Sequence, residues 1–384
     1  MAIICSTDYR SYPMGGMMSF ILDILPSFSN EFDITLWGVL VDGTVPESLE
    51  IGGVSYSLKI FSNVNTGNKI IPNLVKVSIN IWKMREEIMS YDYDIIYVHG
   101  IPLSFPFFNK KNVKIVNHIH GLTNPFSMTE NRMARNAIAV YLYEKYRSWV
   151  VSKSDMILLA SDKQGYTAFS SRYPNDNNKI IYVPNFADEN IFTSVDQICA
   201  RKKLGLEADE IIFVNTGRVS LQKDPVLLVQ SFISFMKTFD YKARLIIIGD
   251  GELRETIEEL AKVSGFQNEI QITGKLDRRE INLWLNAADL YVYTSHANGF
   301  PISLAESASC GLPIVTTDVT GVHDLVINDR TGYLVQTRKS EDIANAIAAA
   351  LAKRQEFSGN MLDITKNYRP DIIIDRMKQL LLAL

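Results

Sequence analysis

Short hydrophobic runs alternate along the chain with longer stretches in which apolar residues recur at helical spacing. A continuous apolar run bounded by turn residues predicts a buried strand, whereas apolar residues three and four apart predict an amphipathic helix. Strands that alternate with helices in this way form parallel sheets covered by helices on both faces. The predicted strands span 2–6, 32–41, 54–61, 94–98, 113–119, 155–160, 180–183, 210–216, 244–249, 270–273, 290–293, 313–316 and 332–335.

Helical periodicity between these runs predicts a complementary set of helices. The segment 42–53 is rich in turn residues and is expected to be a loop. The pattern is therefore α/β from one end of the chain to the other. The predicted helices span 15–25, 73–89, 129–151, 163–171, 196–205, 302–309, 341–352 and 371–384.

The most informative stretch covers 293–315 and reads YTSHANGFPISLAESASCGLPIV. It predicts the end of a strand, a loop, a helix, a turn and a second strand, joined by a right-handed crossover. Pro301 suits the first helical position, because the N–H that it lacks has no partner there. Gly311 suits the left-handed position that ends a helix. The loop should therefore lie at the carboxyl end of a parallel strand, where open α/β sheets bind ligands.

This loop has the features of an anion site. We expect the amides of Ile302, Ser303 and Leu304 to have no acceptor within their own helix, and the helix dipole adds positive potential there. Glu306 lies one turn further along, where a carboxylate suits hydrogen bonds from a ribose diol. Together these residues suggest a nucleotide-diphosphate ligand. The alternative is an ordinary helix with a solvated Glu306.

Other loops at predicted strand ends carry glycine and cationic residues. Gly217 and Arg218 follow one strand, and Lys223 comes shortly after them. A planar guanidinium and a compact ammonium both suit a diphosphate. Gly249 and Gly251 follow the next strand, but the third glycine of a dinucleotide-binding fingerprint is absent.

The first half of the chain carries weaker polar signals. Gly15 and Gly16 join a strand to a helix, where backbone amides can approach a phosphate, although a plain turn has the same sequence. His118 and His120 end a strand, alternate onto one face and precede a glycine. A histidine at such a place is either a hydrogen-bonded structural residue or a functional one. His99 ends another strand and is a weaker candidate.

Composition limits the class of protein. A chain of 384 residues with 47% apolar and 21% charged residues has the length and balance of two globular domains. A net charge of −4 gives no bulk attraction for nucleic acid. There is no leader-like segment and no apolar run of about 18 residues, so we expect a soluble, cytoplasmic protein. The three scattered cysteines lack metal-ligand spacing and suit a reducing compartment.

The stretch 293–315 resembles the donor signature of the family 4 retaining glycosyltransferases of GT-B fold. Asn298 departs from it, because the family has its first glutamate there; an amide donates and accepts hydrogen bonds but carries no charge. The Gly-Arg-x-x-x-x-Lys pattern at 217–223 also matches, and 184–188 resembles the interdomain joint of the family, with Phe186 in place of glycine. The matching residues of the signature are Ser295, Gly299, Phe300, Glu306, Ala308, Gly311 and Pro313.

The resemblance implies a GT-B fold, with two Rossmann-like α/β domains whose parallel sheets face an interdomain cleft. It places an acceptor-side domain at 1–190, a nucleotide-sugar-binding domain at 191–368, and a C-terminal helix, 369–384, that packs back on the first domain. It implies a retaining, metal-independent glycosyltransferase of the hexosyltransferase type that needs no cofactor. The motif from Asp92 to Asp94 resembles a metal-binding D-x-D but is interpreted as the start of a buried strand.

Residue roles follow from the same resemblance. Arg218 and Lys223 would stabilise the leaving diphosphate, and Glu306 would anchor the ribose of the nucleotide-sugar donor. His120 would orient the transferred sugar and Asn298 would contact its hydroxyls, which suggests a donor other than plain glucose. The remaining donor-binding residues are expected to be Gly15, Gly16, Gly217, Gly249, Gly251, Lys275, Leu276, Gly299, Phe300, Pro301, Ile302, Ser303 and Leu304, with no metal ligands.

The acceptor expected from the resemblance is a hydroxyl of a glycan or lipid-linked molecule in surface polysaccharide biosynthesis of the O-antigen or capsule type. The predicted helix 129–151 has basic residues, among them Lys145 and Arg147, and an apolar face that includes Tyr141 and Trp149. It either makes a peripheral contact with a membrane or packs as an ordinary helix with a solvated face. Two other functions remain open: a sugar-nucleotide 2-epimerase of the same fold and a non-catalytic sugar-nucleotide-binding subunit.

Overall fold

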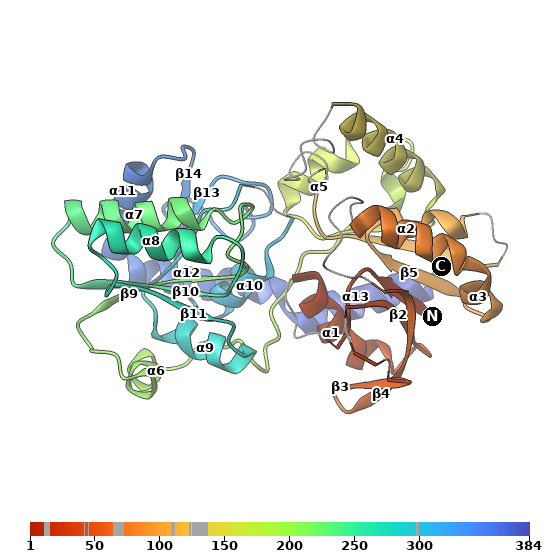
Figure 1. Ribbon diagram of the computed structural model, residues 1–384, viewed down its shortest axis with the longest axis horizontal. Coiled ribbons are helices and arrows are strands. Elements are labelled where there is room, and N and C mark those ends of the chain that lie inside the picture. Colours follow the sequence, from red (N-terminus) through yellow and green to blue (C-terminus); the bar gives the residue numbers. More distant parts are fainter. Residues whose placement is uncertain are drawn as a thin grey trace. The chain divides into compact units, whose positions relative to one another are not determined.

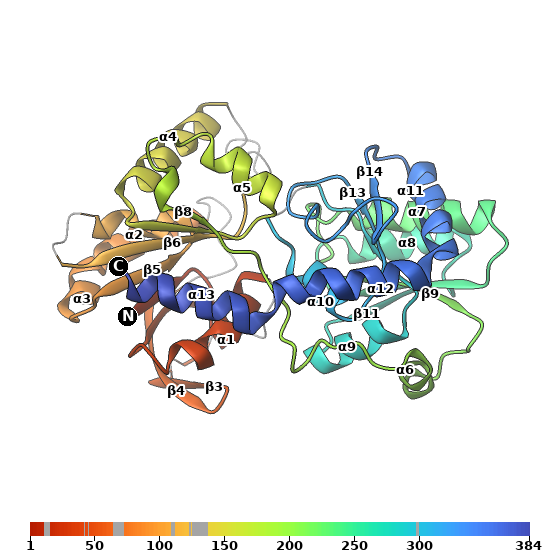
Figure 2. The same ribbon diagram turned by 180° about the vertical axis from the view of Figure 1, so that it is seen from behind.

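The structure is a computed structural model that describes residues 1–10, 16–41, 43–44, 46–63, 73–108, 112–122, 124, 137–296 and 299–384. The chain forms two compact units, each built on a sheet with helices on both faces (Figures 1 and 2). The chain passes from the first unit to the second between Pro184 and Asn185 and returns to the first between Ile372 and Ile373. The sequence predicts these domain boundaries at residues 190 and 368. The first unit comprises Met1–Ser161, Gly165–Pro184 and Ile373–Leu384, and the second comprises Asp162–Gln164 and Asn185–Ile372.

The sheet of the first unit has the strand order β3-β4-β2-β1-β5-β6-β7-β8. The pairings are parallel except for β3 with β4. The chain builds outward from β1 in one direction and then returns to add β5 on its other side, so the topological switch point lies between β1 and β5. The strands are β1 (Ala2–Cys5), β2 (Thr35–Leu40), β3 (Ser48–Ile51), β4 (Val54–Asn63), β5 (Ile95–His99), β6 (Lys114–Ile119), β7 (Met156–Leu159) and β8 (Ile180–Tyr182).

From Ile373 onward the C-terminal helix α13 belongs to the first unit, although the chain from Asn185 to Ile372 belongs to the second. Its apolar stripe, Ile373, Ile374, Met377 and Leu381, is buried, as expected of a helix that packs on a domain. The expected return of this helix to the first unit is therefore confirmed. The helices that cover the sheet are α1 (Gly16–Phe28), α2 (Asn73–Lys83), α3 (Arg85–Ser90), α4 (Ala137–Lys153), α5 (Lys163–Ser170) and α13 (Pro370–Leu382).

Two elements of the first unit differ from the sequence prediction. Segment 42–53 contains the strand β3, which forms a hairpin with β4 through Gly52 and Gly53, both with positive φ. The helix predicted at 73–89 is divided at Met84, whose ψ of 0° departs from the regular α-helical value of about −42°. The apolar stripe continues through Ile81 and Ile88, which are both buried, so periodicity alone could not detect the division.

Helix α4 also differs from its prediction; the expected residues 129–136 lie outside the described residues. Tyr141 and Trp149, expected on a packed apolar face, are exposed by 59% and 41%. Arg147, expected on a solvated basic face, is buried, forms an ion pair with Glu144 and donates to the carbonyl of Leu122 at 3.0 Å. Among the described residues no helix is long and apolar enough to cross a membrane.

The sheet of the second unit has the strand order β11-β10-β9-β12-β13-β14, and its pairings are parallel. From β9 the chain builds outward through β10 to β11 and then returns to place β12 on the other side of β9. The switch point of this sheet therefore lies between β9 and β12. The strands are β9 (Ile211–Thr216), β10 (Ala243–Ile248), β11 (Ile270–Gly274), β12 (Leu290–Tyr293), β13 (Ile314–Thr317) and β14 (Gly332–Val335).

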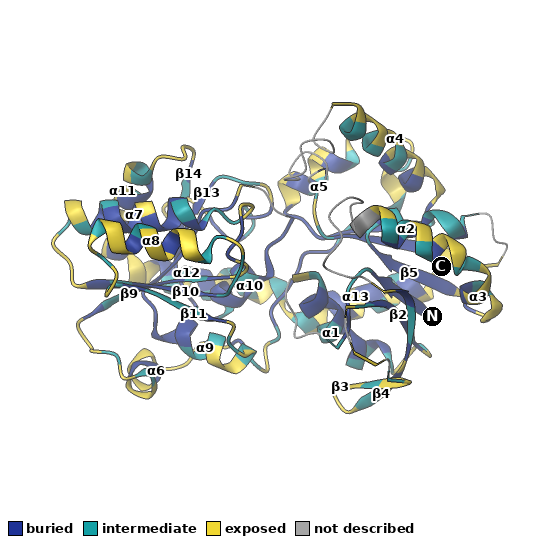
Figure 3. Ribbon diagram, in the orientation of Figure 1, coloured by how far each residue is buried: buried dark blue, intermediate teal, exposed yellow. Residues whose placement is uncertain are grey.

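Two hydrophobic cores lie on opposite faces of this sheet. One packs under α7, α8 and α11, and the other under α9, α10 and α12. Figure 3 shows the result, with buried strands between helices whose outer faces are exposed. The helices are α6 (Gln197–Leu204), α7 (Pro225–Thr238), α8 (Arg254–Ser264), α9 (Arg278–Ala287), α10 (Ile302–Ser309), α11 (Ser340–Ala352) and α12 (Arg354–Thr365).

A buried ion pair fixes α6 to this sheet. The Arg201 guanidinium donates to the Asp289 carboxylate at 2.7 Å and to the carbonyl of Ala287 at 2.9 Å. The same carboxylate oxygen accepts from the amide of Ile212 at 2.8 Å. Because each charge has several partners, the cost of burying the pair is offset within the sheet.

His323 lies between two carboxylates and attaches residues 162–164 to the second unit. His323 contacts Asp162 through Nδ1 at 2.6 Å and Asp318 through Nε2 at 2.7 Å. The fully buried Asp162 carboxylate also accepts from the amide of Gly321 at 2.8 Å. The hydrogen bond to Asp162 raises the pKa of His323. The protonated His323 ring therefore stabilises the folded protein.

We expect His323 to make stability depend on pH. A raised pKa in the folded state stabilises the protein fully below the unfolded value of about 6.5, and the gain is lost as pH rises through the folded pKa. The Tm difference between wild type and His323→Asn should accordingly be larger at about pH 6 than at about pH 9. Thermal unfolding at both pH values checks this, and equal differences would contradict the contribution of the imidazolium.

Candidate functional site

The predicted unit around α10 forms at the switch point of the second sheet, except that Pro301, predicted as the first helical residue, is the extended residue just before the helix, with ψ of 123°. Strand β12 and helix α10 have the predicted bounds, and β13 pairs parallel with β12. Gly311 adopts the left-handed conformation, with φ of 77°, just after the helix. The loop between β12 and α10 leaves the sheet beside the loop that follows β9, because β9 and β12 are neighbours. Ligands of open α/β sheets bind at such a point.

The loop after β9 carries two cations toward this edge. The half-buried Lys223 donates through Nζ to the hydroxyl of Tyr293 at 2.6 Å and lies 5.0 Å from the centre of that ring. Arg218 is exposed. Burial and the neighbouring positive charge of Arg218 lower the pKa of Lys223 to about 8. Two neighbouring cations on one loop favour an anion beside them.

Hydrogen bonds fix the segment that carries Lys223 to the end of β12. The carbonyl of Gln222 accepts from the Ser295 hydroxyl at 2.8 Å and from the amide of His296 at 2.9 Å. The Thr294 hydroxyl donates to the carbonyl of Asp224 at 2.9 Å. The position of the ammonium therefore follows from the backbone of the neighbouring loop.

The side chain of Asp224 reinforces this attachment. Its backbone is left-handed, with φ of 47°, and its carboxylate accepts from the amide of Leu227 at 3.1 Å at the start of α7. The other oxygen lies 2.6 Å from Arg338 and 3.1 Å from His296. Arg338 also donates to the carbonyl of Thr294 at 2.7 Å. Asp224 and Arg338 were not singled out as site residues, because their contacts depend on tertiary structure.

The glycines after β10 allow two loops to touch. A Cβ on Gly249 would lie 1.8 Å from the carbonyl oxygen of Gly217, and one on Gly251 would lie 2.4 Å from that of Val219. The amide of Val219 donates to the carbonyl of Asp250 at 3.0 Å. Gly249 and Gly251 thus support the loop that carries Arg218. The sequence predicted only that they would lie near a nucleotide.

The N-terminus of α10 has fewer free donors than expected. The amide of Leu304 donates to the carbonyl of Pro301 at 3.1 Å, so the prediction that it has no partner is wrong. A tight first turn satisfies it. No described residue accepts from the amides of Ile302 and Ser303. Glu306, one turn along, is only 8% exposed, so it is not the solvated side chain of the alternative interpretation.

Tertiary contacts hold the rest of the signature loop. The buried Phe300 packs against Tyr368, and its carbonyl accepts from Asn185 at 2.5 Å. A Cβ on Gly321 would lie 1.3 Å from the carbonyl oxygen of Gly299. Asn298 lies outside the described residues.

The predicted wall residues follow β11 in the sheet. Gly274, with φ of 75°, ends this strand and forms a bridge with Gly249. Lys275 is exposed, and the partly buried Leu276 packs on the core under α9 and α10. The loops after β9, β10 and β11 therefore follow one another along one edge of the sheet.

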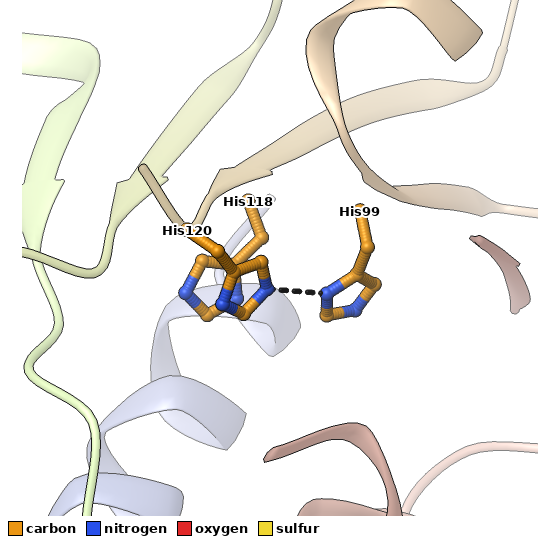
Figure 4. Close-up of side chains that lie close together, drawn as sticks. All are labelled: His99, His118 and His120. Atoms are coloured by element: carbon orange, nitrogen blue, oxygen red, sulfur yellow. Dashed lines mark hydrogen bonds between the residues drawn. The ribbon is translucent and has the colours of Figure 1, made fainter. Parts of the chain in front are cut away.

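The remaining predicted residues belong to the first unit. Gly15 lies outside the described residues, and the exposed Gly16 begins α1. His120 follows β6 and contacts a second histidine: its Nε2 lies 2.8 Å from Nδ1 of His99 (Figure 4). His118 lies beside them, and its Nδ1 is 2.6 Å from the hydroxyl of Tyr97.

These three histidines are neutral at physiological pH. Burial lowers the pKa of His120 to about 3 and lowers the pKa values of His99 and His118 well below their ordinary range. The ring of Phe20 covers the group and lies edge-on to His118 and His120. Neutral imidazoles both donate and accept hydrogen bonds, so the group suits a polar, uncharged ligand better than a phosphate.

Comparison with known proteins identifies similar sequences and folds. The sequence model of the family "Glycosyl transferases group 1" matches residues 196–368. A curated relative, D-inositol 3-phosphate glycosyltransferase of Xylanimonas cellulosilytica, is 30% identical over 213 residues, which are 53% of this chain and 50% of that protein. The match thus spans about half the length of this relative.

Two solved structures have the same fold over the whole chain. A sucrose-phosphate synthase from Thermosynechococcus elongatus superposes with a TM-score of 0.82 at 18% identity, covering 100% of this chain and 98% of that chain. The Anabaena protein HepE in complex with UDP gives a TM-score of 0.73 at 18% identity, with 100% of both chains covered. Residues 196–368 therefore match the sequence model of the glycosyl transferases group 1, and the fold of the chain is GT-B.

Proposed function

We propose that this protein is a retaining glycosyltransferase that moves a sugar from a nucleotide-diphosphate sugar to a hydroxyl of an acceptor. The observation that carries the proposal is the pair of cations, Arg218 and Lys223, held at the switch point of the second sheet beside the start of α10. The similarity of the fold to a protein that binds UDP supports a nucleotide ligand at this edge.

The proposed reaction separates the sugar from its diphosphate on the face where the acceptor arrives. The bond between the anomeric carbon and the phosphate oxygen breaks, and an oxocarbenium-like transition state forms. The acceptor oxygen bonds to the same face, and its proton passes to the departing phosphate oxygen. Retention follows because both bonds share one face, and this scheme needs neither an enzyme nucleophile nor a metal.

Negative charge develops on the leaving diphosphate, and the residues that stabilise this charge promote the reaction. Arg218, Lys223 and the amides of Ile302 and Ser303 stabilise it, a form of electrostatic preorganisation. Glu306 accepts hydrogen bonds from the ribose diol. The glycines after β10 keep the Arg218 loop in place, and Lys275 and Leu276 flank the base.

The residues that we propose to contact the transferred sugar are those that the family resemblance implies. His120 orients it through a neutral ring, Gly15 and Gly16 approach the donor phosphates, and Asn298 contacts the sugar hydroxyls. We propose a glycan or lipid-linked acceptor in surface polysaccharide biosynthesis at the cytoplasmic face of a membrane. Exposed Tyr141 and Trp149 on α4 support a peripheral membrane contact.

Donor turnover with and without acceptor distinguishes this function from its alternatives. A 2-epimerase converts the donor without acceptor, and a binding subunit converts nothing. The substitution of Asn298 for the family glutamate favours a binding subunit, whereas the retained Arg218, Lys223 and Glu306 favour catalysis.

The first prediction from the proposed function concerns Arg218. A ligand that binds only the folded protein raises stability by about 2.7 kcal/mol at a hundred times its Kd. In a thermal-shift screen of UDP-, GDP-, dTDP- and ADP-sugars, one nucleotide class should stabilise wild type and not Arg218→Ala. Turnover should fall about 100–1000-fold. Arg279→Ala removes another exposed arginine and should behave as wild type; no shift with any donor would contradict the assigned site.

The second prediction concerns Lys223 and pH. Because its pKa is lowered to about 8, the ammonium loses its proton, and with it the charge that binds the diphosphate, as pH rises above that value. The kcat/KM for the donor should therefore decline above about pH 8, since this ratio reports groups of the free enzyme. Lys223→Arg keeps its charge and should move the decline to higher pH. Identical profiles for both proteins would exclude Lys223 as the titrating group.

The third prediction tests the contact between the loops. Gly251→Ala places a Cβ 2.4 Å from the carbonyl oxygen of Val219, so the loop that carries Arg218 must move. A shift of about 1 Å at a positioning group costs about 100-fold in rate, and we expect such a loss of kcat/KM. Gly359→Ala on α12 meets nothing within 4 Å and should keep wild-type activity. Unchanged activity of both variants would show that the contact does not position Arg218.

A further inference from the structure

We propose that His99, His118 and His120 bind a divalent transition metal ion of the zinc class. Each residue offers a ring nitrogen, and these nitrogens lie within 4.8 Å of one another. Figure 4 shows the three rings gathered in one place. The reaction proposed above does not use this ion, and the inference rests on the geometry of the three histidines; with zinc bound, His120 would be a ligand of the ion rather than a contact of the transferred sugar.

The register of the first sheet brings these residues together. His99 and His118 are paired positions on the neighbouring strands β5 and β6, and Cys5 on β1 is the partner of His99 on its other side. Paired positions point to the same face of a sheet, and His120 follows His118 on that face. The group thus lies at carboxyl strand ends beside the switch point between β1 and β5, where α/β sheets bind ligands.

The hydrogen bonds of the group leave ring nitrogens without partners. Within the described part of the chain, Nε2 of His99, Nε2 of His118 and Nδ1 of His120 are buried and have no hydrogen-bond partner. His99 and His118 are exposed by only 1% and 0%. Burying a polar atom without a partner costs free energy. A metal ion bound at Nε2 of His118 would remove this cost for that nitrogen, whereas His99 and His120 would present the two nitrogens that now share a hydrogen bond.

Tyr97 has the position of an outer-shell partner. When the Tyr97 hydroxyl accepts from Nδ1–H of His118 at 2.6 Å, the lone pair of His118 lies on the unpartnered Nε2. Metal-binding histidines usually donate their other ring N–H in this way. His99 and His120 share one hydrogen bond of 2.8 Å, which must open for both to present lone pairs.

The spacing suits zinc after small ring movements. Two Zn–N bonds of about 2.0–2.1 Å at a tetrahedral angle place their nitrogens about 3.3 Å apart. The His99–His120 distance of 2.8 Å would lengthen by about 0.5 Å, and the other separations, which are within 4.8 Å, would shorten by at most about 1.5 Å. Imidazole ligands favour zinc and related ions over magnesium or calcium. His120 is only partly buried, which leaves a fourth position for water.

Zinc content and Co²⁺ spectra test the proposal without any sugar donor. After incubation with zinc and removal of the excess, wild type should retain about one ion per chain and His118→Asn far less, as measured by elemental analysis. His296→Asn removes a histidine from the second unit and should retain the ion. Zinc content well below one ion in wild type, or equal in wild type and His118→Asn, would overturn the proposal.

A milder variant covers the case in which His118→Asn fails to fold. Tyr97→Phe keeps all three histidines and removes only the outer-shell hydroxyl, so its zinc affinity should fall about 10–100-fold in competition with a chelating dye. In wild type, bound Co²⁺ should give the intense visible bands of a four-coordinate site. Unchanged affinity in Tyr97→Phe together with a six-coordinate Co²⁺ spectrum would show that the ion binds elsewhere.

Discussion

The attachment of the loop after β9 to the loop after β12 determines the geometry of the candidate donor site. The carbonyl of Gln222 accepts from Ser295 and His296, and the Asp224 carboxylate holds Arg338. Lys223 lies between Gln222 and Asp224, so its ammonium is placed by backbone contacts rather than by its own flexible stem. Arg218 and Lys223 repel each other, and only a fixed backbone keeps both cations at one edge. Such fixed charge can stabilise a diphosphate without reorganisation during the reaction.

Much of the second unit could be predicted because its local signals agree with its tertiary structure. Pro301 and Gly311 mark the beginning and end of α10, and the runs on either side are strands buried on both faces. The first unit was harder to predict where local sequence signals conflict with the tertiary structure. The hairpin strand β3 alternates between exposed and partly buried residues, so it lacks the apolar run that identifies the other strands. Arg147 is buried through contacts with Glu144 and Leu122, which no periodicity reveals.

The site follows the same division. Residue types at strand ends predicted Arg218 and Lys223, since carboxyl ends of parallel strands share an edge, and Glu306 was predicted from its place one turn into the helix that follows such an end. The role of Gly251 as a contact for Val219, and the bond that occupies the amide of Leu304, require coordinates. The histidine group needed the register of β5 and β6 as well, because no sequence spacing pairs His99 with His118.

Burial lowers pKa values at both sites but leaves one site cationic and the other neutral. Desolvation lowers the pKa of Lys223 from 10.5 to about 8 and that of His120 from 6.5 to about 3. The lysine begins far above physiological pH and keeps its proton, whereas the histidine begins close to it and loses its own. The switch point of the second sheet is therefore cationic and suits phosphates, while that of the first is neutral and suits hydroxyls or a metal ion. One physical effect thus gives the two units different ligands, because lysine and histidine begin from different reference values.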